Sequence, residues 1–406
     1  MAEVIIIGGG AAGMAAAIEA ASLGDSVLLL ERMDRVGKKL LATGNGRCNL
    51  MNRGEGCYPG GEDFAREVLA RCGAREQEAF WQRLGLRLRE EDGGRVYPVS
   101  GQASTVLDAL RLGMERAGVQ VETGVQAEGI RREKGGFTVL AGEKRWHAER
   151  VILAGGGCAQ PKLGSDGSLW ALAEGLGHHL HRPRPALTQI VTDTAPIRGL
   201  SGIRVKAEVT ALRGGRETHR EAGEVLFADY GVSGVCVMNT ARHVDKGGTL
   251  LLNLLPGMAF AGEGEARDEL WRRRNAWAQQ PMEALLTGLC VPRLASALCR
   301  QAGIQWKERL IGSLSRQEAE QLAKALGAFP LRVQGVKGFD MAQVTAGGLD
   351  TAEFDPATMG SRLVPGLYAA GEMLDVDGAC GGFNLMFAFG SGMLAGRCAA
   401  ETGGNV

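Results

Sequence analysis

A glycine-rich turn close to the N-terminus has the residue types and spacing needed to bind a phosphate group. Gly8, Gly10 and Gly13 follow the apolar run at residues 4–7 and open a run of strong helix formers. These glycines permit a tight turn and let backbone amides approach a pyrophosphate at the helix N-terminus. A second apolar run ends in Glu31, whose carboxylate can accept a hydrogen bond from a ribose hydroxyl. Strand, turn, helix, strand and acid together predict an adenine dinucleotide site.

Three later segments indicate that the dinucleotide is FAD rather than NAD. Residues 154–156 and 371–372 each stand at the end of an expected strand, where backbone can lie against a long cofactor. The helix expected from about Asn384 would present free N–H groups to the isoalloxazine ring and raise its reduction potential. No second Gly-x-Gly-x-x-Gly opens a helix, so no separate NAD(P)H domain is expected.

The expected contacts to a non-covalently bound FAD come from these segments and from the polar loop after Glu31. For Arg47, which could instead hold the substrate, we favour the cofactor role. In chain order the contacts are Gly8, Gly10, Ala12, Gly13, Glu31, Arg32, Lys39, Thr43, Gly44, Asn45, Gly46, Arg47, Cys48, Val125, Ala154, Gly155, Gly156, Gly371, Glu372, Gly382, Phe383, Asn384 and Leu385.

Four residues within the flavin-contacting motifs are candidates for catalysis, as proton donors or as groups that orient the ring. They are Cys48, Cys380, Asp375 and Asp377. The alternatives are that the cysteines are inert packing residues and that the aspartates bond to local backbone N–H groups.

Histidines at positions 178, 179 and 181 form a cluster that has the ligand type of a metal site. Surface histidines after a helix end are the preferred interpretation, so no metal site is predicted.

The expected elements predict an α/β fold with a Rossmann-like FAD-binding domain of the glutathione reductase type, interrupted by insertions. Four short strands, at residues 119–123, 125–130, 136–140 and 144–147, are expected to form a small meander. Residues 181–185 contain two prolines and are expected to be a linker. The predicted limits are 1–187 and 346–406 for the FAD-binding domain, 188–257 with about 329–345 for a β subdomain, and 258–328 for a helical subdomain.

Composition restricts the partners and the compartment. The 406 residues carry 46 basic and 46 acidic side chains, so no global field attracts DNA, RNA or an anionic membrane. Nine cysteines without a C-x-x-C pair argue against a disulfide reductase and indicate a reducing compartment. The N-terminus leaves no room for a signal peptide, and no apolar run is long enough to span a membrane. We expect a cytoplasmic protein.

Two long motifs resemble the BaiN/RdsA (YhiN-like) family of FAD-dependent oxidoreductases. They are Gly37-Lys-Lys-Leu-Leu-Ala-Thr-Gly-Asn-Gly-Arg-Cys-Asn49 and Gly371-Glu-Met-Leu-Asp-Val-Asp-Gly-Ala-Cys-Gly-Gly-Phe-Asn-Leu385, and the similarity runs from Val4 to Gly396. The resemblance implies a fold related to fumarate reductase and ketosteroid dehydrogenase flavoproteins, with the insertion closing over the flavin. One branch of the family is associated with dihydrouridine formation in ribosomal RNA and another with bile acid dehydroxylation. Both imply reduction of a conjugated C=C bond.

The expected insertion begins with an excess of basic residues. They are Arg182, Arg184, Arg198, Arg204, Lys206, Arg213, Arg216 and Arg220, with a second cluster at Arg272, Arg273 and Arg274 between Trp271 and Trp277. Basic groups interleaved with aromatic rings are typical of an RNA-binding surface. An ordinary solvated face explains the same pattern equally well.

The sequence therefore predicts an FAD-dependent oxidoreductase whose reduced flavin delivers hydride to an electron-poor C=C bond. The leading substrate hypothesis is a uracil base in ribosomal RNA. The alternatives are a small conjugated substrate, such as an enoyl or steroid-like compound, and a non-catalytic flavin redox sensor. An external electron donor is expected, with NAD(P)H as a candidate.

Overall fold

The computed structural model describes residues 2–401 and divides them into two compact units. One unit runs from the N-terminus to Pro185 and resumes at Ala342. The other, Ala186–Met341, is inserted between these two parts. Each unit has its own hydrophobic core.

The first unit is built around a five-stranded sheet in the order β19-β10-β1-β2-β6, and every neighbouring pair is parallel. Its strands are β1 (Val4–Ile7), β2 (Val27–Glu31), β6 (Gln120–Thr123), β10 (Arg150–Leu153) and β19 (Leu367–Ala369). All four residues of β1 are buried, as the apolar run predicts for a central parallel strand. This sheet and its covering helices confirm the predicted α/β class with a Rossmann-like domain.

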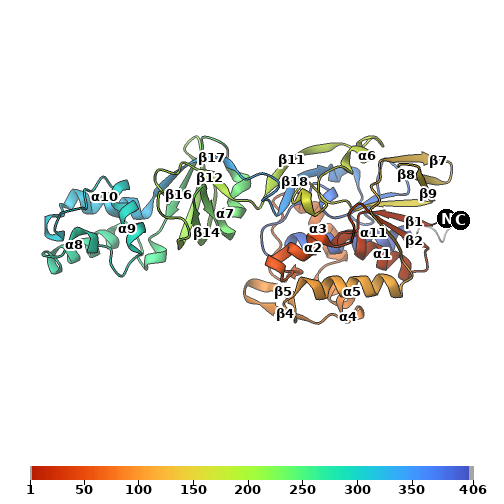
Figure 1. The fold of residues 1–406 in the computed structure, drawn as a ribbon, viewed down its shortest axis with the longest axis horizontal. Coiled ribbons are helices and arrows are strands. Elements are labelled where there is room, and N and C mark those ends of the chain that lie inside the picture. Colours follow the sequence, from red (N-terminus) through yellow and green to blue (C-terminus); the bar gives the residue numbers. More distant parts are fainter. Residues whose placement is uncertain (1, 402–406) are drawn as a thin grey trace. The chain divides into compact units, whose positions relative to one another are not determined.

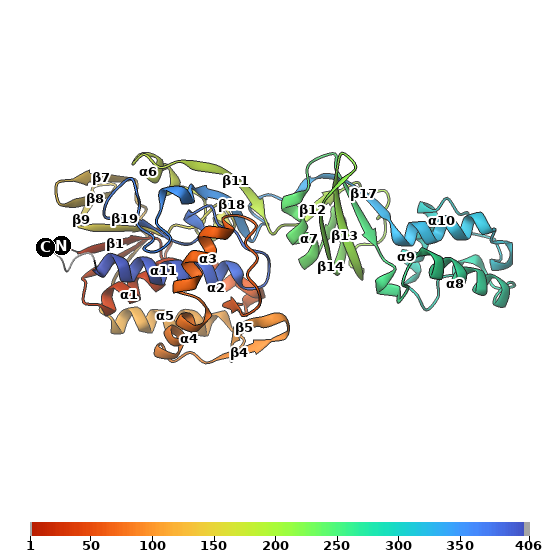
Figure 2. The ribbon, with the colours of Figure 1, turned by 180° about the vertical axis from the view of Figure 1, so that it is seen from behind.

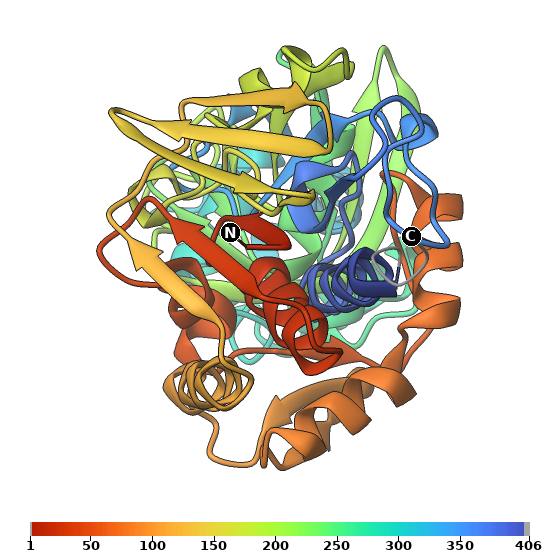
Figure 3. The same ribbon diagram turned by 90° about the vertical axis from the view of Figure 1, so that its right-hand side faces the viewer.

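The predicted four-stranded meander is wrong in two respects. β6 joins the edge of the parallel sheet beside β2, because the helix before it makes a crossover connection. Residues 125–128 are not a strand, and the next strand begins only at Gly129. The antiparallel sheet therefore has three strands, β7 (Gly129–Glu133), β8 (Gly136–Ala141) and β9 (Lys144–Ala148), seen in yellow and orange in Figure 3.

Helices α1 (Ala11–Ser22) and α11 (Phe383–Glu401) pack side by side beneath the sheet (Figures 2 and 3). Small residues make this close approach possible. A Cβ at Gly392 would lie 2.3 Å from the Ala12 carbonyl oxygen, and one at Gly396 would lie 2.3 Å from that of Ala16.

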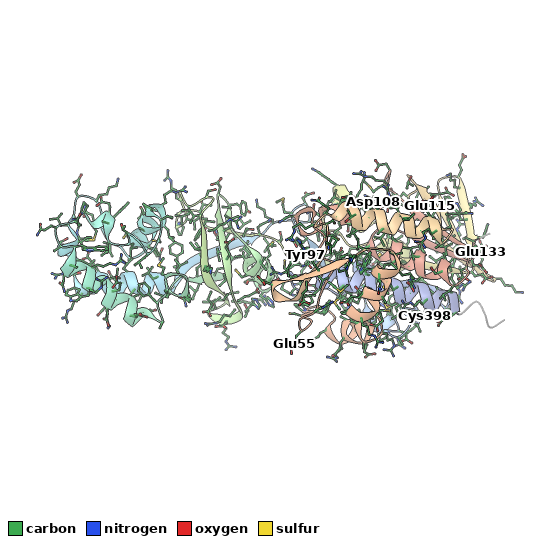
Figure 4. All side chains as sticks on the ribbon, turned by 90° about the horizontal axis from the view of Figure 1, so that it is seen from below. Glu55, Tyr97, Asp108, Glu115, Glu133 and Cys398 are labelled. Atoms are coloured by element: carbon green, nitrogen blue, oxygen red, sulfur yellow. The ribbon has the colours of Figure 1, made fainter. Side chains whose placement is uncertain are left out.

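Five more helices and a further small sheet lie around the central sheet and its loops in the described part of the first unit. The helices are α2 (Lys38–Ala42), α3 (Glu62–Arg71), α4 (Ala74–Arg83), α5 (Ala103–Arg116) and α6 (Trp170–Glu174). In Figure 4, Asp108 and Glu115 mark the solvent-exposed face of α5. A small antiparallel sheet has the order β3 (Met51–Asn52), β5 (Arg95–Pro98), β4 (Leu88–Glu91).

The linker predicted at residues 181–185 is a strand. β11 (Leu180–Ala186) and β18 (Val344–Leu349) form a two-stranded sheet. Prolines are tolerated in β11 because it pairs with one strand only. A residue that faces away from β18 has no backbone N–H bond to lose.

The second unit contains a closed barrel in the order β12-β15-β14-β13-β16-β17. Its strands are β12 (Ile190–Thr192), β13 (Arg204–Arg213), β14 (Arg216–Ala228), β15 (Gly231–Ser233), β16 (Thr249–Asn253) and β17 (Phe329–Val336). The short helix α7 (Val235–Thr240) packs on β14 and is not apparent from the strand-like sequence pattern.

Three longer helices occupy the chain between β16 and β17 (Figure 1). They are α8 (Glu263–Ala276), α9 (Pro292–Gln301) and α10 (Arg316–Gly327). The start of α10 has a capping box: Glu318 N donates to Ser315 Oγ at 3.1 Å, and Ser315 N donates to Glu318 Oε2 at 2.8 Å. No helix within residues 2–401 has the length and apolar character required to cross a membrane.

The contact between α1 and α11 gives a prediction about stability. Gly396→Ala places a methyl group against the Ala16 carbonyl and should destabilise the protein by about 1–3 kcal/mol, as overpacking usually does. The matched variant Gly264→Ala lies in α8, where an added Cβ meets no atom within 4 Å, and should be neutral or slightly stabilising. Denaturant unfolding measures both, and equal stabilities for the two variants would contradict the tight packing.

Candidate functional site

The turn after β1 forms a cradle that only glycine can build. Gly8 has φ +113°, and a Cβ there would lie 2.4 Å from the Ala154 carbonyl oxygen. A Cβ at Gly13 would lie 1.9 Å from the carbonyl oxygen of Gly8. Gly10 differs, because a Cβ there would meet no protein atom within 4 Å. Open space therefore lies beside Gly10, at the N-terminus of α1, where the first-turn amides have no intrahelical acceptor.

Glu31 places a carboxylate next to this cradle. It is 8% exposed, and its Oε2 accepts a hydrogen bond from Gly9 N at 2.7 Å while Oε1 accepts one from Met33 N at 2.7 Å. The predicted cofactor contact Val125 lies beside the same residue, with its N–H donating to the Glu31 carbonyl at 2.9 Å. Amide donors, open space and an acidic acceptor are the groups that bind the pyrophosphate and ribose of a dinucleotide. The residues present fit an adenine dinucleotide.

The second end of the candidate site is the N-terminus of α11. Gly381 and Gly382 precede it with φ values of +142° and +107°. A Cβ at Gly382 would lie 2.6 Å from the Met51 carbonyl oxygen, so no larger residue fits. The amides of the first turn of this 19-residue helix again lack intrahelical acceptors. They can stabilise negative charge on a ligand that binds at this end of the helix.

Neutral polar side chains hold the turn before α11 in place. The side-chain amide of Asn384, a predicted cofactor contact, pairs with the backbone of Gly378 through hydrogen bonds of 2.8 Å in each direction. Asn52 Nδ2 donates to the Gly381 carbonyl at 2.8 Å, and Tyr58 Oη donates to the Phe383 carbonyl at 3.0 Å. No sequence pattern points to Asn52 or Tyr58, because both lie far from this turn in the chain and belong to no glycine motif.

Gly371 connects the two ends of the site. Its N–H donates to Ser391 Oγ of α11 at 3.0 Å, and a Cβ there would lie 3.0 Å from the Cβ of Ala12 in α1. The same Cβ would lie 3.8 Å from the Cβ of Ala388, five residues after the start of α11. Ala12 itself packs on Gly392, nine residues after the start of α11, so at 1.5 Å per residue the α11 N-terminus lies about 13.5 Å from the level of Ala12 along the helix axis. A ligand that spans both helix N-termini must be extended.

The loop at residues 43–48 is folded by left-handed backbone. Gly44 and Asn45 both have φ 55°, and Cys48 has φ 58°. Arg47 points to the small sheet, where it pairs with Glu91 at 2.6 Å and stacks 4.2 Å from the ring centroid of Tyr97 (labelled in Figure 4). These contacts occupy the guanidinium, so the predicted cofactor role of Arg47 has no support from its position.

The cations predicted near the cofactor are in ion pairs. Lys39 Nζ lies 2.5 Å from Glu372 Oε2, and Glu372 Oε1 accepts a hydrogen bond from Thr345 N at 2.9 Å. Arg32 is paired with Asp166. Compensated charges of this kind leave the backbone amides as the main groups that can hold a phosphate.

The four catalytic candidates have different surroundings. Cys48 is 0% exposed, so a substrate cannot reach its thiol in this structure, which argues against a role as proton donor. The same burial raises the pKa of the thiol to about 12. Asp377 is buried and its backbone bridges that of Gly60. Asp375 Oδ1 accepts a hydrogen bond from Gly347 N at 2.9 Å, and its Oδ2 lies 3.7 Å from Nδ1 of His181. Asp375 and the partly buried Cys380 remain predicted proton donors.

The interpretation of the histidines at positions 178, 179 and 181 as surface residues holds for His179 but not for His178. His178 is buried, with Nδ1 2.8 Å from Glu353 Oε2 and Nε2 3.0 Å from Ser361 Oγ. His179 is exposed and also contacts Glu353, which raises the pKa of that imidazole. Within residues 2–401 no group of three or more His, Cys, Asp or Glu side chains is arranged to hold a metal ion.

The predicted basic cluster of the insertion is largely bound to its own unit. Arg273 donates to the carbonyls of Leu285 and Thr287 at 3.0 and 2.7 Å. Its guanidinium also lies 4.8 Å from the Trp277 centroid, and that of Arg274 lies 4.6 Å from the Trp271 centroid. Each of these guanidinium groups occupies a tryptophan face that would otherwise be open to a stacked RNA base.

Comparisons with known proteins agree with this geometry. The model of the family described as "HI0933-like protein Rossmann domain" matches residues 2–398. A 3-dehydro-bile acid delta(4,6)-reductase from Clostridium scindens is 40% identical, over 99% of this chain and 100% of that protein. A ribosomal RNA dihydrouridine synthase from Escherichia coli is 29% identical, over 96% of each chain. The structure of a 3-ketosteroid-Δ4-(5α)-dehydrogenase from Rhodococcus jostii RHA1 is similar in fold, with a TM-score of 0.51, 19% identity and coverage of 98% and 96%.

The burial of Cys48 can be tested by alkylation of the folded protein. At pH 8 we expect iodoacetamide to modify the exposed Cys57 at least about ten times faster than Cys48, because a buried thiol of raised pKa forms little thiolate. Peptide mass spectrometry measures both positions, and urea-unfolded protein, in which the two should react alike, is the control. Rapid labelling of Cys48 in the folded state would restore it as a catalytic candidate.

Proposed function

Because the chain belongs to the HI0933-like family, which spans almost its whole length, we propose that it is an FAD-dependent reductase of conjugated C=C bonds. The family establishes that the protein is an oxidoreductase. Our proposal concerns the bond that it reduces. The observation that carries the proposal is the extended site with a helix N-terminus at each end. A flavin adenine dinucleotide has a pyrophosphate and a ring that becomes anionic on reduction, and these need such amide donors at two separate places.

Separate groups of the chain would bind the two ends of FAD and supply the proton. The amides after Gly8 and Gly10 hold the pyrophosphate, and Glu31 accepts from the ribose. The α11 amides, held by Asn52 and Asn384, stabilise negative charge at the pyrimidine side of the ring. FAD bound in this way, without a covalent link and reduced by an external donor such as NAD(P)H, would supply the hydride that the substrate carbon accepts. Asp375 is the proposed proton source, since its carboxylate is partly exposed beside the turn that leads to α11.

For the substrate we favour a small cyclic enone, such as a 3-oxo steroid or bile acid with conjugated double bonds. The 40% identical relative carries the name of such a reductase, and identity at this level over the full chain supports a shared substrate class. A carbonyl conjugated with the double bond makes its far carbon electron-poor, as hydride transfer requires. This reverses the order expected from the sequence, where uracil in ribosomal RNA came first.

Uracil in ribosomal RNA is the second candidate, because a 29% identical relative is named for that reaction. Uracil also contains a C=C bond conjugated with a carbonyl, so the same hydride chemistry would serve. The contacts of Arg273 and Arg274 with their own unit count against the predicted RNA footprint.

Gly10 provides a test of the cofactor. Gly10→Val should leave the apoprotein folded, since no protein atom lies within 4 Å of the new Cβ, yet lower FAD affinity at least about tenfold by filling the space for the pyrophosphate. Purified wild type should be yellow and release FAD on denaturation. FAD content and circular dichroism measure the two effects. A wild type that neither contains nor takes up FAD would refute the proposal.

The substrate is tested under anaerobic conditions with chemically reduced holoenzyme. Mixing with a 3-oxo-4-ene or 3-oxo-4,6-diene bile acid should reoxidise the flavin in a single turnover and add two hydrogens to the steroid. Ribosomal RNA from a strain lacking dihydrouridine, tested in parallel, should leave the flavin reduced. Absorbance and mass spectrometry record the results. Reoxidation by RNA alone, with dihydrouridine formed, would select the second candidate.

A further inference from the structure

The order of the central sheet places two loops on either side of the dinucleotide cradle. β1 lies between β2 and β10, and all three strands are parallel, so their carboxyl ends share one edge. Neighbouring strands are about 4.8 Å apart, which separates β2 from β10 by about 9.6 Å. The end of β1, where the turn at Gly8 begins, lies in this gap. A contact between the loops after β2 and β10 therefore bridges the two strands that flank the cradle.

Such a contact exists directly after Glu31. Arg32 forms an ion pair with Asp166, which belongs to the loop that follows β10. Beside this pair, Met33 packs on Gly164, where a Cβ would lie 3.0 Å from Met33 Cγ. Ser165 Oγ donates to the Gly157 carbonyl at 2.9 Å and so folds this part of the loop back to the end of β10.

The acidic partner is fixed and charged. Asp166 Oδ1 accepts a hydrogen bond from Ser168 N at 3.1 Å, which leaves Oδ2 for Arg32. Burial by itself raises the pKa of the Asp166 carboxyl, but the hydrogen bonds from Ser168 and Arg32 outweigh it and hold that pKa below its ordinary value. The carboxylate is ionised at neutral pH. The side chains are 24% and 34% exposed, so the pair can open to solvent without leaving a buried charge.

We propose that Arg32 and Asp166 form a clasp across the adenosine end of the site and that this clasp sets how fast the dinucleotide leaves. The identity of the ligand as FAD rests on the proposed function. The clasp makes Arg32 a positioning residue, whereas the sequence predicts a direct cofactor contact for it. The two roles differ in one respect. A clasp needs Asp166 as much as Arg32, but a direct contact of Arg32 with FAD does not need Asp166.

The experiment follows FAD release from the holoprotein after dilution, through the recovery of flavin fluorescence. Asp166→Asn and Arg32→Gln should each speed release by about two- to fivefold, the range expected for a partly exposed ion pair. The double variant should release FAD no faster than either single variant, because the pair acts as a unit. The exchanged pair, Arg32→Asp with Asp166→Arg, should return the rate to within about twofold of wild type. Asp268→Asn, which breaks the exposed Arg267–Asp268 pair of the other unit, is the matched control and should leave the rate unchanged.

Salt and pH give independent readouts. Raising the ionic strength should speed release from wild type and have less effect on Asp166→Asn, since the clasp is already open there. Because the pKa of Asp166 is lowered, the clasp should persist down to about pH 4 and be lost only as the carboxylate is protonated below it.

The outcomes separate this inference from the proposed function. Wild type that binds no FAD would refute the function. Wild type that binds FAD but releases it at the same rate as Asp166→Asn would refute the clasp alone. Faster release in Arg32→Gln with an unchanged rate in Asp166→Asn would show that Arg32 contacts the cofactor directly. If the exchanged pair fails to fold, additivity of the two single variants decides in its place.

Discussion

The close approach of backbone to backbone at a few glycines is the constraint on which the site depends. Gly13 packs on the Gly8 carbonyl, Gly8 packs on Ala154, and Gly392 packs on Ala12. Each contact leaves no room for a Cβ, so the end of β1 and the start of α1 are fixed together. Only with this spacing can the first amides of α1 face the open space beside Gly10. The rigid core thus positions backbone amides, which need no side-chain chemistry to bind a ligand.

Charge around the site is arranged in pairs rather than as a positive surface. Lys39 with Glu372, and Arg32 with Asp166, neutralise the cations that would otherwise draw in a phosphate. Helix N-termini then provide the attraction for a dinucleotide, and they do so over a short range and with a defined direction. A chain with equal numbers of acidic and basic residues thus has local groups that suit a cofactor with two phosphates.

The turn before α11 is shaped by side chains that need not touch the ligand. Asn384, Asn52 and Tyr58 each bond to backbone of the segment 378–383. All are neutral at physiological pH, and burial raises the pKa of the Tyr58 phenol further. A charged group in these positions would compete with the helix amides for the electrostatic control of a flavin ring. The groups that hold the turn are therefore side chains, whereas the groups that would stabilise the ligand are backbone amides.

The sequence by itself determined the α/β class, the family and the oxidoreductase chemistry, because glycine spacing and buried apolar runs are local features with a narrow physical meaning. The start of α10 is likewise local, because Ser315 and Glu318 form its capping box within four residues of chain. The sequence did not determine the partners of long side chains. Arg47 reaches Glu91, Arg273 reaches Leu285, and Arg32 reaches Asp166, because flexible charged groups find partners that only the folded chain brings near. Tertiary pairing likewise decided that β6 joins the parallel sheet and that residues 181–185 form a strand. The residues of a strand do not specify which other strand it pairs with.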